Sequence, residues 1–415
     1  MSLETAAIIA IGSEMLGPTR LDTNSLKLTA ALEDFGITVV RKSVIGDRLQ
    51  DLVNEIRFSL GHAELLFVTG GLGPTKDDLT REALSEALGL SMEVDQQIID
   101  RLEARFAARG WKMPQSNKRQ ANVFQGQTTL INERGTAPGF HIESEGKHIW
   151  VFPGVPMELE WMIATYLRPW LEAQIGGRAR YRRVLKISGM TESKVEEELK
   201  PYYDAHHDEE PVTILASGGQ IELHVAAGGD EAAARAVIAA RERELIAIFA
   251  EKVFGYDDDT LESVIGGLLT GRNETLATAE SCTGGLLSSR ITDVPGSSAY
   301  FLGGVVCYTA QAKMFLVGVD PQLIQDDGEV SESVAIELAK GARRRFGTTW
   351  GVGVTGIAGP GGGSEAKPVG TVHIAVAGPQ GVEPRRLFWP MTRAMFKWFS
   401  AQAALDLLRL SILRM

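Results

Sequence analysis

The sequence lacks several features that would assign it to a common class of protein. It has two cysteines in 415 residues, which form neither a disulfide framework nor a zinc-binding pattern, so a reducing, cytoplasmic location is expected. It has no excess of basic residues, and its net charge of −11 argues against a general nucleic-acid binder. No uninterrupted apolar stretch is long enough to cross a bilayer, and the start lacks the basic region of a signal peptide. We therefore expect no membrane partner.

The composition is that of an ordinary water-soluble protein, and the length is sufficient for two or three domains. The first third alternates predicted strands and helices. Strands are predicted at 6–11 and 37–44, and helices at 23–35 and 48–60, the second capped by Asp47. This alternation indicates an α/β domain with a mostly parallel sheet, in which ligands bind beyond the carboxyl ends of the strands.

The pattern changes near residue 180. A small α+β module follows, with a hairpin predicted over 212–229. A second α/β region begins near Leu261, with strands predicted at 274–280, 303–309, 348–356 and 370–378.

One candidate site lies in LLFVTGGLGPTKDDLT (65–80), which is typical of a strand, a glycine loop and a helix. Glycines let the backbone approach an anion closely, and a helix start presents free N–H groups to it. The adjacent carboxylates Asp77 and Asp78 would repel a phosphate unless a divalent cation lay between them. The alternative is an ordinary turn whose acidic residues suit the helix dipole.

A second candidate site lies in TLATAESCTGGLLSSRIT (275–292), where Ser281 occupies a tight turn before a helix. The following N–H groups could hold an oxyanion. This region supplies no histidine as a base, but Lys313 follows another predicted strand, and a desolvated lysine can accept the serine proton. The alternatives are that Ser281 only caps the helix, that Lys313 is a surface residue, or that Cys282 is the nucleophile.

Several motifs resemble signatures of the CinA family. Over residues 5–170 these are GSEMLGPTRLDTNS, VTGGLGPTKDDLTREA, SNKRQA, GTAPGF and FPGVPMEL; over 260–415 they are TAESCTGG, YTAQAK, VGVTGIAGPGGGS and KPVGTVHIA. The resemblance implies three domains: a molybdopterin-binding-like domain (1–172), a KH-like connecting domain (173–254) and a C-terminal CinA domain (255–415). The middle module lacks the GXXG loop of RNA-binding KH domains, so we interpret it as a spacer and dimer element of a homodimer.

For the N-terminal domain, the resemblance implies an ADP-ribose pyrophosphatase that forms AMP and ribose 5-phosphate with Mg, Mn or Co. The implied metal ligands are Asp77 and Asp78, with Glu14 and Asp22 as further candidates. The implied substrate contacts are Gly70, Gly71, Gly73 and Thr75 for phosphate, and Asn24 and Asn117 for ribose or phosphate.

For the C-terminal domain, the resemblance implies a cofactor-free deamidase that converts nicotinamide mononucleotide to the nicotinate form and ammonia. Ser281 would be the nucleophile and Lys313 its base, with Tyr308 nearby. The implied substrate-binding residues are Thr283, Gly284 and Gly285 around the oxyanion, Gly356, Ala358 and Gly359 in the nucleotide pocket, and Arg393 at the 5′-phosphate.

The chain departs from the family pattern at Ala310 and at Met391–Thr392, where polar residues are usual. Loss of one buried polar partner would weaken substrate binding by about 1–3 kcal/mol. Two other functions stay open from the sequence: a binding protein associated with competence and DNA damage, with one or both sites inactive, and a pterin-binding enzyme.

Overall fold

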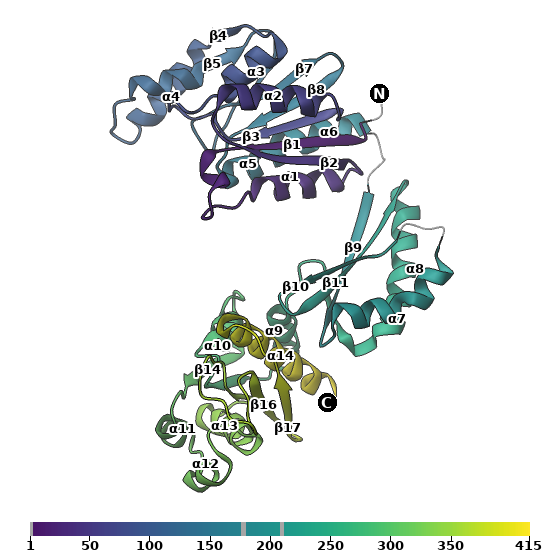
Figure 1. The fold of residues 1–415 in the computed structure, drawn as a ribbon, viewed down its shortest axis with the longest axis vertical. Helices are drawn as coiled ribbons and strands as arrows, with labels where there is room; N and C mark the ends of the chain where they lie inside the picture. Colours follow the sequence, from purple (N-terminus) through teal and green to yellow (C-terminus); the bar gives the residue numbers. More distant parts are fainter. Residues whose placement is uncertain (1–2, 176–179, 208–210) are drawn as a thin grey trace. The chain divides into compact units, whose positions relative to one another are not determined.

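The computed structural model describes residues 3–175, 180–207 and 211–415, and the chain divides into two compact units (Figure 1). Unit 1 comprises Met1–Tyr181 and Ala227–Val237, and unit 2 comprises Arg182–Ala226 and Ile238–Met415. Within the described residues, no helix is long and apolar enough to cross a membrane.

Unit 1 contains a six-stranded sheet with the order β2-β1-β3-β8-β7-β6. The first four strands of that order are parallel, and β7 and β6 are antiparallel. Their bounds are β1 (Thr5–Ile11), β2 (Thr38–Ile45), β3 (Leu65–Thr69), β6 (Thr128–Leu130), β7 (Gly139–Ser144) and β8 (Lys147–Phe152).

Helices cover both faces of this sheet because alternate residues of its buried strands point to opposite sides. Along β1, Ala6 and Ile8 join one core cluster, while Ala7 and Ile9 join another. The first cluster includes residues of α1 (Asn24–Glu33), α5 (Pro156–Met162) and α6 (Arg168–Ile175). The second includes residues of α2 (Leu49–Leu60), α3 (Thr80–Leu88) and α4 (Gln96–Ala107). A separate two-stranded ribbon pairs β4 (Met92–Val94) with β5 (Asn122–Phe124).

The predicted cap of α2 is wrong. The helix begins at Leu49, and the residue before it, Arg48, makes no side-chain cap. Asp47 instead accepts a 2.8 Å hydrogen bond from the Ser13 N–H, so its carboxylate joins the end of β2 to the short 3₁₀ helix Ser13–Leu16. The Asp47 carboxylate therefore bonds to a residue distant in the sequence instead of to the start of the helix that follows it.

The middle module has a four-stranded sheet with the order β10-β11-β9-β12. The bounds are β9 (Arg180–Ser188), β10 (Thr213–Ser217), β11 (Gln220–Gly228) and β12 (Val253–Tyr256), with helices α7 (Glu192–Ala205) and α8 (Glu231–Phe249). Strands β10 and β11 form the predicted antiparallel hairpin, which turns at Gly218 and Gly219.

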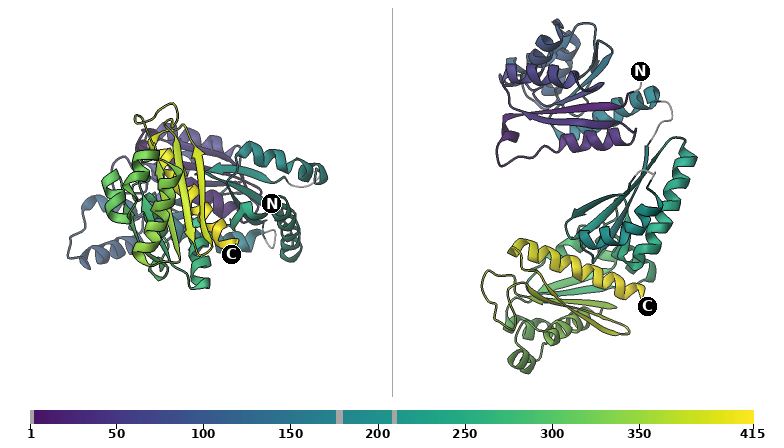
Figure 2. Two further views of the ribbon diagram at one scale, coloured as in Figure 1. Left: turned by 90° about the horizontal axis from the view of Figure 1, so that it is seen from below. Right: turned by 45° about the vertical axis from the view of Figure 1, so that its right-hand side comes forward.

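The last part of unit 2 contains a five-stranded sheet with the order β14-β13-β15-β16-β17. Strands β13 (Leu276–Glu280), β14 (Phe301–Val306) and β15 (Trp350–Gly356) are parallel; β16 (Thr371–Gly378) and β17 (Gly381–Phe388) are antiparallel. Helices α9 (Leu261–Arg272), α10 (Leu286–Thr292) and α14 (Arg393–Leu413) pack on one face. Figure 2 shows α14, in yellow, lying along the sheet. Helices α11 (Ala310–Val317) and α13 (Glu332–Phe346) pack on the other face. The short helix α12 (Pro321–Asp327) lies between them in the chain. These sheets confirm the predicted α/β fold class.

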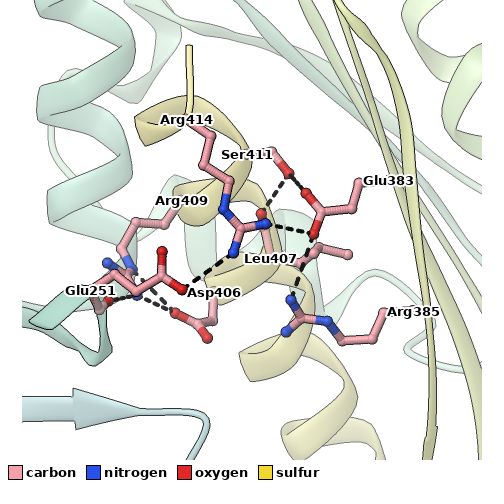
Figure 3. A network of polar contacts seen from close by, with 8 residues as sticks. All are labelled: Glu251, Glu383, Arg385, Asp406, Leu407, Arg409, Ser411 and Arg414. Atoms are coloured by element: carbon pink, nitrogen blue, oxygen red, sulfur yellow. Dashed lines mark hydrogen bonds and ion pairs between the residues drawn. The ribbon is translucent and has the colours of Figure 1, made fainter. Parts of the chain in front are cut away.

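A buried polar network joins α14 to the middle module within unit 2 (Figure 3). Arg409 pairs with Asp406 at 2.7 Å, the two side chains being 2% and 3% exposed, and it donates 2.8 Å to the carbonyl of Glu251. At the rim, Arg414 lies between the carboxylates of Glu251 and Glu383, at 3.3 and 3.0 Å. The network fixes the end of α14 against both β17 and the residues after α8.

Candidate functional site

The glycine turn after β3 has a backbone that only glycine fits. Gly70 and Gly71 have φ angles of +102° and +64°. A Cβ at Gly70 would collide with the Ile11 carbonyl oxygen, and one at Gly71 would collide with the Thr80 hydroxyl. The turn therefore places backbone atoms that no side chain covers at the carboxyl ends of the parallel strands, where α/β sheets bind ligands.

Two arginines hold the carbonyl groups of this turn. The Arg81 side chain, 1% exposed, donates 3.0 Å hydrogen bonds to the carbonyls of Leu72 and Gly73. Arg119 donates to the carbonyls of Thr75 and Asp78. Arg81 could not be predicted as a site residue from the sequence, because an arginine in an amphipathic helix is typical of a solvent-facing position. Because Arg81 is buried, its hydrogen bonds hold the turn in one conformation.

The four predicted metal ligands have different local roles. Asp78 accepts hydrogen bonds from both the N–H and the hydroxyl of Thr75, at 2.8 and 2.5 Å. Asp77 is exposed, and the nearby Thr75 side chain holds the pKa of its carboxyl below the usual value. Asp22 accepts hydrogen bonds from the N–H and the hydroxyl of Ser25 in the first turn of α1, and Glu14 lies exposed on the 3₁₀ helix.

These carboxylates do not converge as a ligand set of three: among the described residues, one such cluster occurs, and it lies elsewhere. Magnesium, however, commonly uses one or two carboxylates and takes its other ligands from water and phosphate. Asp77 and Asp78 fit that mode of binding.

Asn24, the first residue of α1, bonds to the ends of two neighbouring strands, β3 and β8. Its amide nitrogen donates 3.0 Å to the Thr69 hydroxyl and 2.9 Å to the Gly154 carbonyl. Its Oδ1 is buried and has no hydrogen-bond partner among the residues that the structure describes. Such an orphaned acceptor is costly unless a ligand or water reaches it. Asn117 is bonded internally to Gln120 at 3.0 Å, so the structure favours Asn24 over Asn117 as a ligand contact.

The second candidate site is a cavity of about 470 Å³ in unit 2. Ser281 and Lys313 both line it and are 6% and 1% exposed. The predicted residues Tyr308, Gly356, Ala358, Gly359 and Arg393 line it too, whereas Thr283, Gly284 and Gly285 are not among its lining residues.

The fold explains why Ser281 and Lys313 meet. Ser281 directly follows β13, whose neighbour β14 is parallel and leads through Tyr308 to α11. Thr309 caps α11 by accepting a 3.2 Å hydrogen bond from the Ala312 N–H, which places Lys313 on the first turn. Because the carboxyl ends of parallel neighbours share one edge, both side chains reach the same cavity.

The charges around the cavity suit an anionic ligand. Lys313, Lys367 and Arg393 line it with one carboxylate, Glu329, whose Oε2 lies 3.2 Å from the Lys313 Nζ. Arg393 donates 2.6 Å to the Tyr308 hydroxyl and 3.0 Å to the Gly359 carbonyl. Glu329 and Lys367 could not be predicted as cavity residues, because no sequence spacing connects either residue to Lys313.

The turn after Ser281 does not offer all the predicted oxyanion donors. The Gly284 N–H donates 3.1 Å to the Ser281 carbonyl, and the Gly285 N–H donates 3.0 Å to Glu280. The buried Glu280 carboxylate also accepts from the N–H groups of Leu287 and Ser288. The Glu280 carboxylate at the end of β13 therefore accepts the hydrogen bonds of the N–H groups at the start of α10. Gly284 and Gly285 form the turn between Ser281 and this helix.

The two thiols are unsuited to nucleophilic chemistry. Burial raises the pKa of Cys282 to about 12 and that of Cys307 to about 11. Both therefore stay protonated near neutral pH, whereas the nucleophilic form of cysteine is the thiolate.

The residues that depart from the expected pattern have structural roles. Thr392 caps α14 and accepts a 3.5 Å hydrogen bond from the Met395 N–H, and Met391 packs against the core. Ala310 is the first residue of α11. These positions form the two helix starts beside the cavity.

Comparison with known proteins found similarity along most of the chain. Residues 7–173 match the model of a probable molybdopterin binding domain, 182–255 that of the damage-inducible protein CinA KH domain, and 258–412 that of the CinA C-terminal domain.

Full-length relatives are also similar. A CinA-like protein of Solibacter usitatus is 41% identical over 405 residues, 97% of each chain. One of Koribacter versatilis is 41% identical over 409 residues, 97% of this chain and 99% of that one. A crystal structure of competence/damage inducible protein CihA from Agrobacterium tumefaciens covers 37% of this chain and 93% of that one, with 38% identity and a TM-score of 0.36.

Proposed function

The chain belongs to the CinA family, and on that premise we propose that its C-terminal cavity hydrolyses the amide of nicotinamide mononucleotide. The observation that carries the proposal is the shared placement of Ser281 and the buried Lys313 in one cation-lined cavity. Its volume of about 470 Å³ lies within the range of small-molecule sites.

In the proposed reaction, the Ser281 Oγ attacks the carboxamide carbon while its proton passes to the Lys313 Nζ. The Glu329 carboxylate stabilises the ammonium that forms, as the carboxylate does in a catalytic triad. Lys313 then protonates the departing nitrogen, ammonia leaves, and an acyl ester of Ser281 remains. Water, deprotonated by Lys313, hydrolyses that ester and releases the nicotinate mononucleotide.

The substrate would be held at its other end by charge. Arg393 and Lys367 line the cavity, and they could receive the 5′-phosphate. Tyr308 accepts its hydrogen bond from Arg393, so its own hydroxyl proton stays available to a phosphate oxygen.

We propose a second activity for the N-terminal domain, the hydrolysis of ADP-ribose to AMP and ribose 5-phosphate. The orphaned Asn24 Oδ1 and the glycine turn at the same sheet edge support it. Asp77 and Asp78 would hold the divalent cation, which would neutralise pyrophosphate charge when bound. Arg81 and Arg119 keep the turn in place, and Asn24 would accept a hydrogen bond from a ribose hydroxyl.

Measurement of ammonia release from nicotinamide mononucleotide tests the main proposal. The parent protein should release ammonia, Ser281→Ala should not, and Ser289→Ala should match the parent. Ser289 is a matched control because it lies exposed on α10, near Ser281 in the chain. Equal ammonia release by Ser281→Ala and the parent would refute the serine mechanism.

A further inference from the structure

A hairpin of unit 1 brings together two histidines and a glutamate that neither proposed activity uses. His141 and Glu143 lie on β7, and His148 lies on β8. The strands pair Glu143 with His148 and His141 with Trp150. Because side chains alternate along a strand and directly paired residues share a face, all three polar side chains lie on one face of the hairpin.

The donor atoms have the spacing of a metal site. The His141 Nε2 lies 3.2 Å from the His148 Nδ1, and the Glu143 Oε1 lies 3.7 Å from the same His148 nitrogen. All three ligand atoms lie within 4.8 Å of one another. A tetrahedral ion with metal–nitrogen bonds of about 2.0–2.1 Å places two imidazole nitrogens about 3.3 Å apart. An ion could therefore enter with little change in the positions of the side chains.

Aromatic rings hold the two imidazoles in place. The Trp150 ring stacks on His141 with a centroid distance of 4.2 Å. Trp170 of α6 packs edge-on against His141 and His148, at 5.2 and 4.7 Å. A ligand fixed by packing loses little freedom when it binds a metal, so this arrangement is preorganised.

The cluster is separate from the glycine turn of unit 1. His148 pairs with Leu65 at the start of β3, whereas Phe152 pairs with Thr69 at its end, where the glycine turn begins. Four residues of strand correspond to about 13 Å. The cation proposed for ADP-ribose hydrolysis belongs to the end of β3, so the hairpin cluster is a second and independent location.

We propose that His141, Glu143 and His148 form a binding site for a divalent transition metal such as zinc, with water as the remaining ligand. Two imidazoles and one carboxylate suit Zn²⁺, Co²⁺ or Ni²⁺, whereas Mg²⁺ prefers oxygen ligands alone. The ion would join β7 to β8 within the six-stranded sheet and stabilise their pairing.

The test uses tag-free, full-length protein that has been dialysed against a chelator. Zinc is titrated calorimetrically, and Ni²⁺ is titrated by quenching of tryptophan fluorescence, since Trp150 and Trp170 adjoin the ligands. His148→Gln and Glu143→Gln are the informative variants. His62→Gln is the matched control, because His62 is an exposed histidine of the same unit at the end of α2.

The expected result is one zinc per chain that His62→Gln retains and that His148→Gln binds at least about tenfold more weakly, because loss of even an outer-shell partner costs 10–100-fold. Glu143→Gln should weaken binding by a smaller factor, and it should leave folding unchanged because the Glu143 side chain is exposed. Asp77→Asn should leave zinc affinity unchanged. Equal zinc affinity for the parent and His148→Gln, or no zinc binding by the folded parent, would overturn the proposal.

Discussion

Replacement of Lys313 by methionine separates catalysis from stability in the C-terminal domain. The Lys313 side chain is 1% exposed and pairs at 3.2 Å with Glu329, which is 47% exposed. Methionine has a similar length and no charge to desolvate, and Glu329 can turn to water. We therefore expect Lys313→Met to fold with a free energy of unfolding equal to or above that of the parent.

Ammonia release should change in the opposite direction. A positioned general base contributes about 10²–10⁴-fold to a rate, so Lys313→Met should lose at least about 100-fold in kcat. The assay couples ammonia release from saturating nicotinamide mononucleotide to a dehydrogenase, and urea unfolding gives the stability.

Lys340→Met is the matched control, because Lys340 is an exposed lysine that pairs with Glu337 at 3.0 Å on α13. It should retain the parent rate. A folded Lys313→Met protein that releases ammonia within about threefold of the parent rate would refute the role of Lys313 as base.

Three further predictions concern other parts of the molecule. Arg409→Met should destabilise unit 2 by about 3–5 kcal/mol in urea unfolding, because it leaves Asp406 charged and buried; an unchanged midpoint would contradict this. In protein freed of metal by a chelator, unit 1 should lose stability as pH falls from 6.5 toward 4. Burial lowers the pKa of His141 to about 4, so in this pH range the unfolded chain binds a proton on His141 that the folded chain does not. This loss should reach about 3 kcal/mol and be smaller in His141→Phe, and equal losses in both proteins would exclude His141 as the cause. Asp77→Asn should slow AMP formation from ADP-ribose at least about tenfold while the exposed Asp100→Asn does not, and equal rates would remove Asp77 from the metal site.

Local signals in the sequence predicted the elements that surround both proposed sites. The glycine turn after β3 follows from Gly70 and Gly71, whose φ angles only glycine adopts easily. The hairpin of β10 and β11 follows from alternation around two glycines. The positions of Ser281 and Lys313 follow from strand ends that must meet at one sheet edge.

Features set by tertiary contacts could not be predicted in this way. Glu329 reaches Lys313 from another segment. The sequence predicts Glu280 only as a strand residue, but its carboxylate accepts hydrogen bonds from N–H groups at the start of α10. Asp47 bonds to Ser13 instead of capping α2.

The histidine cluster depends on the register of β7 and β8, which pairs Glu143 with His148. The alternation of His141 and Glu143, followed by a glycine turn and His148, was the available signal. This pattern predicts that the three side chains meet only when a hairpin with that register is assumed.

The most direct test of the central claim identifies the residue that carries the acyl group during turnover. The protein is mixed with nicotinamide mononucleotide, quenched rapidly in acid and digested, and its peptides are analysed by mass spectrometry. We predict the nicotinate mononucleotide acyl ester on Ser281, absent from Ser281→Ala. An acyl group on Cys282, or on no residue of a protein that is releasing ammonia, would contradict the account.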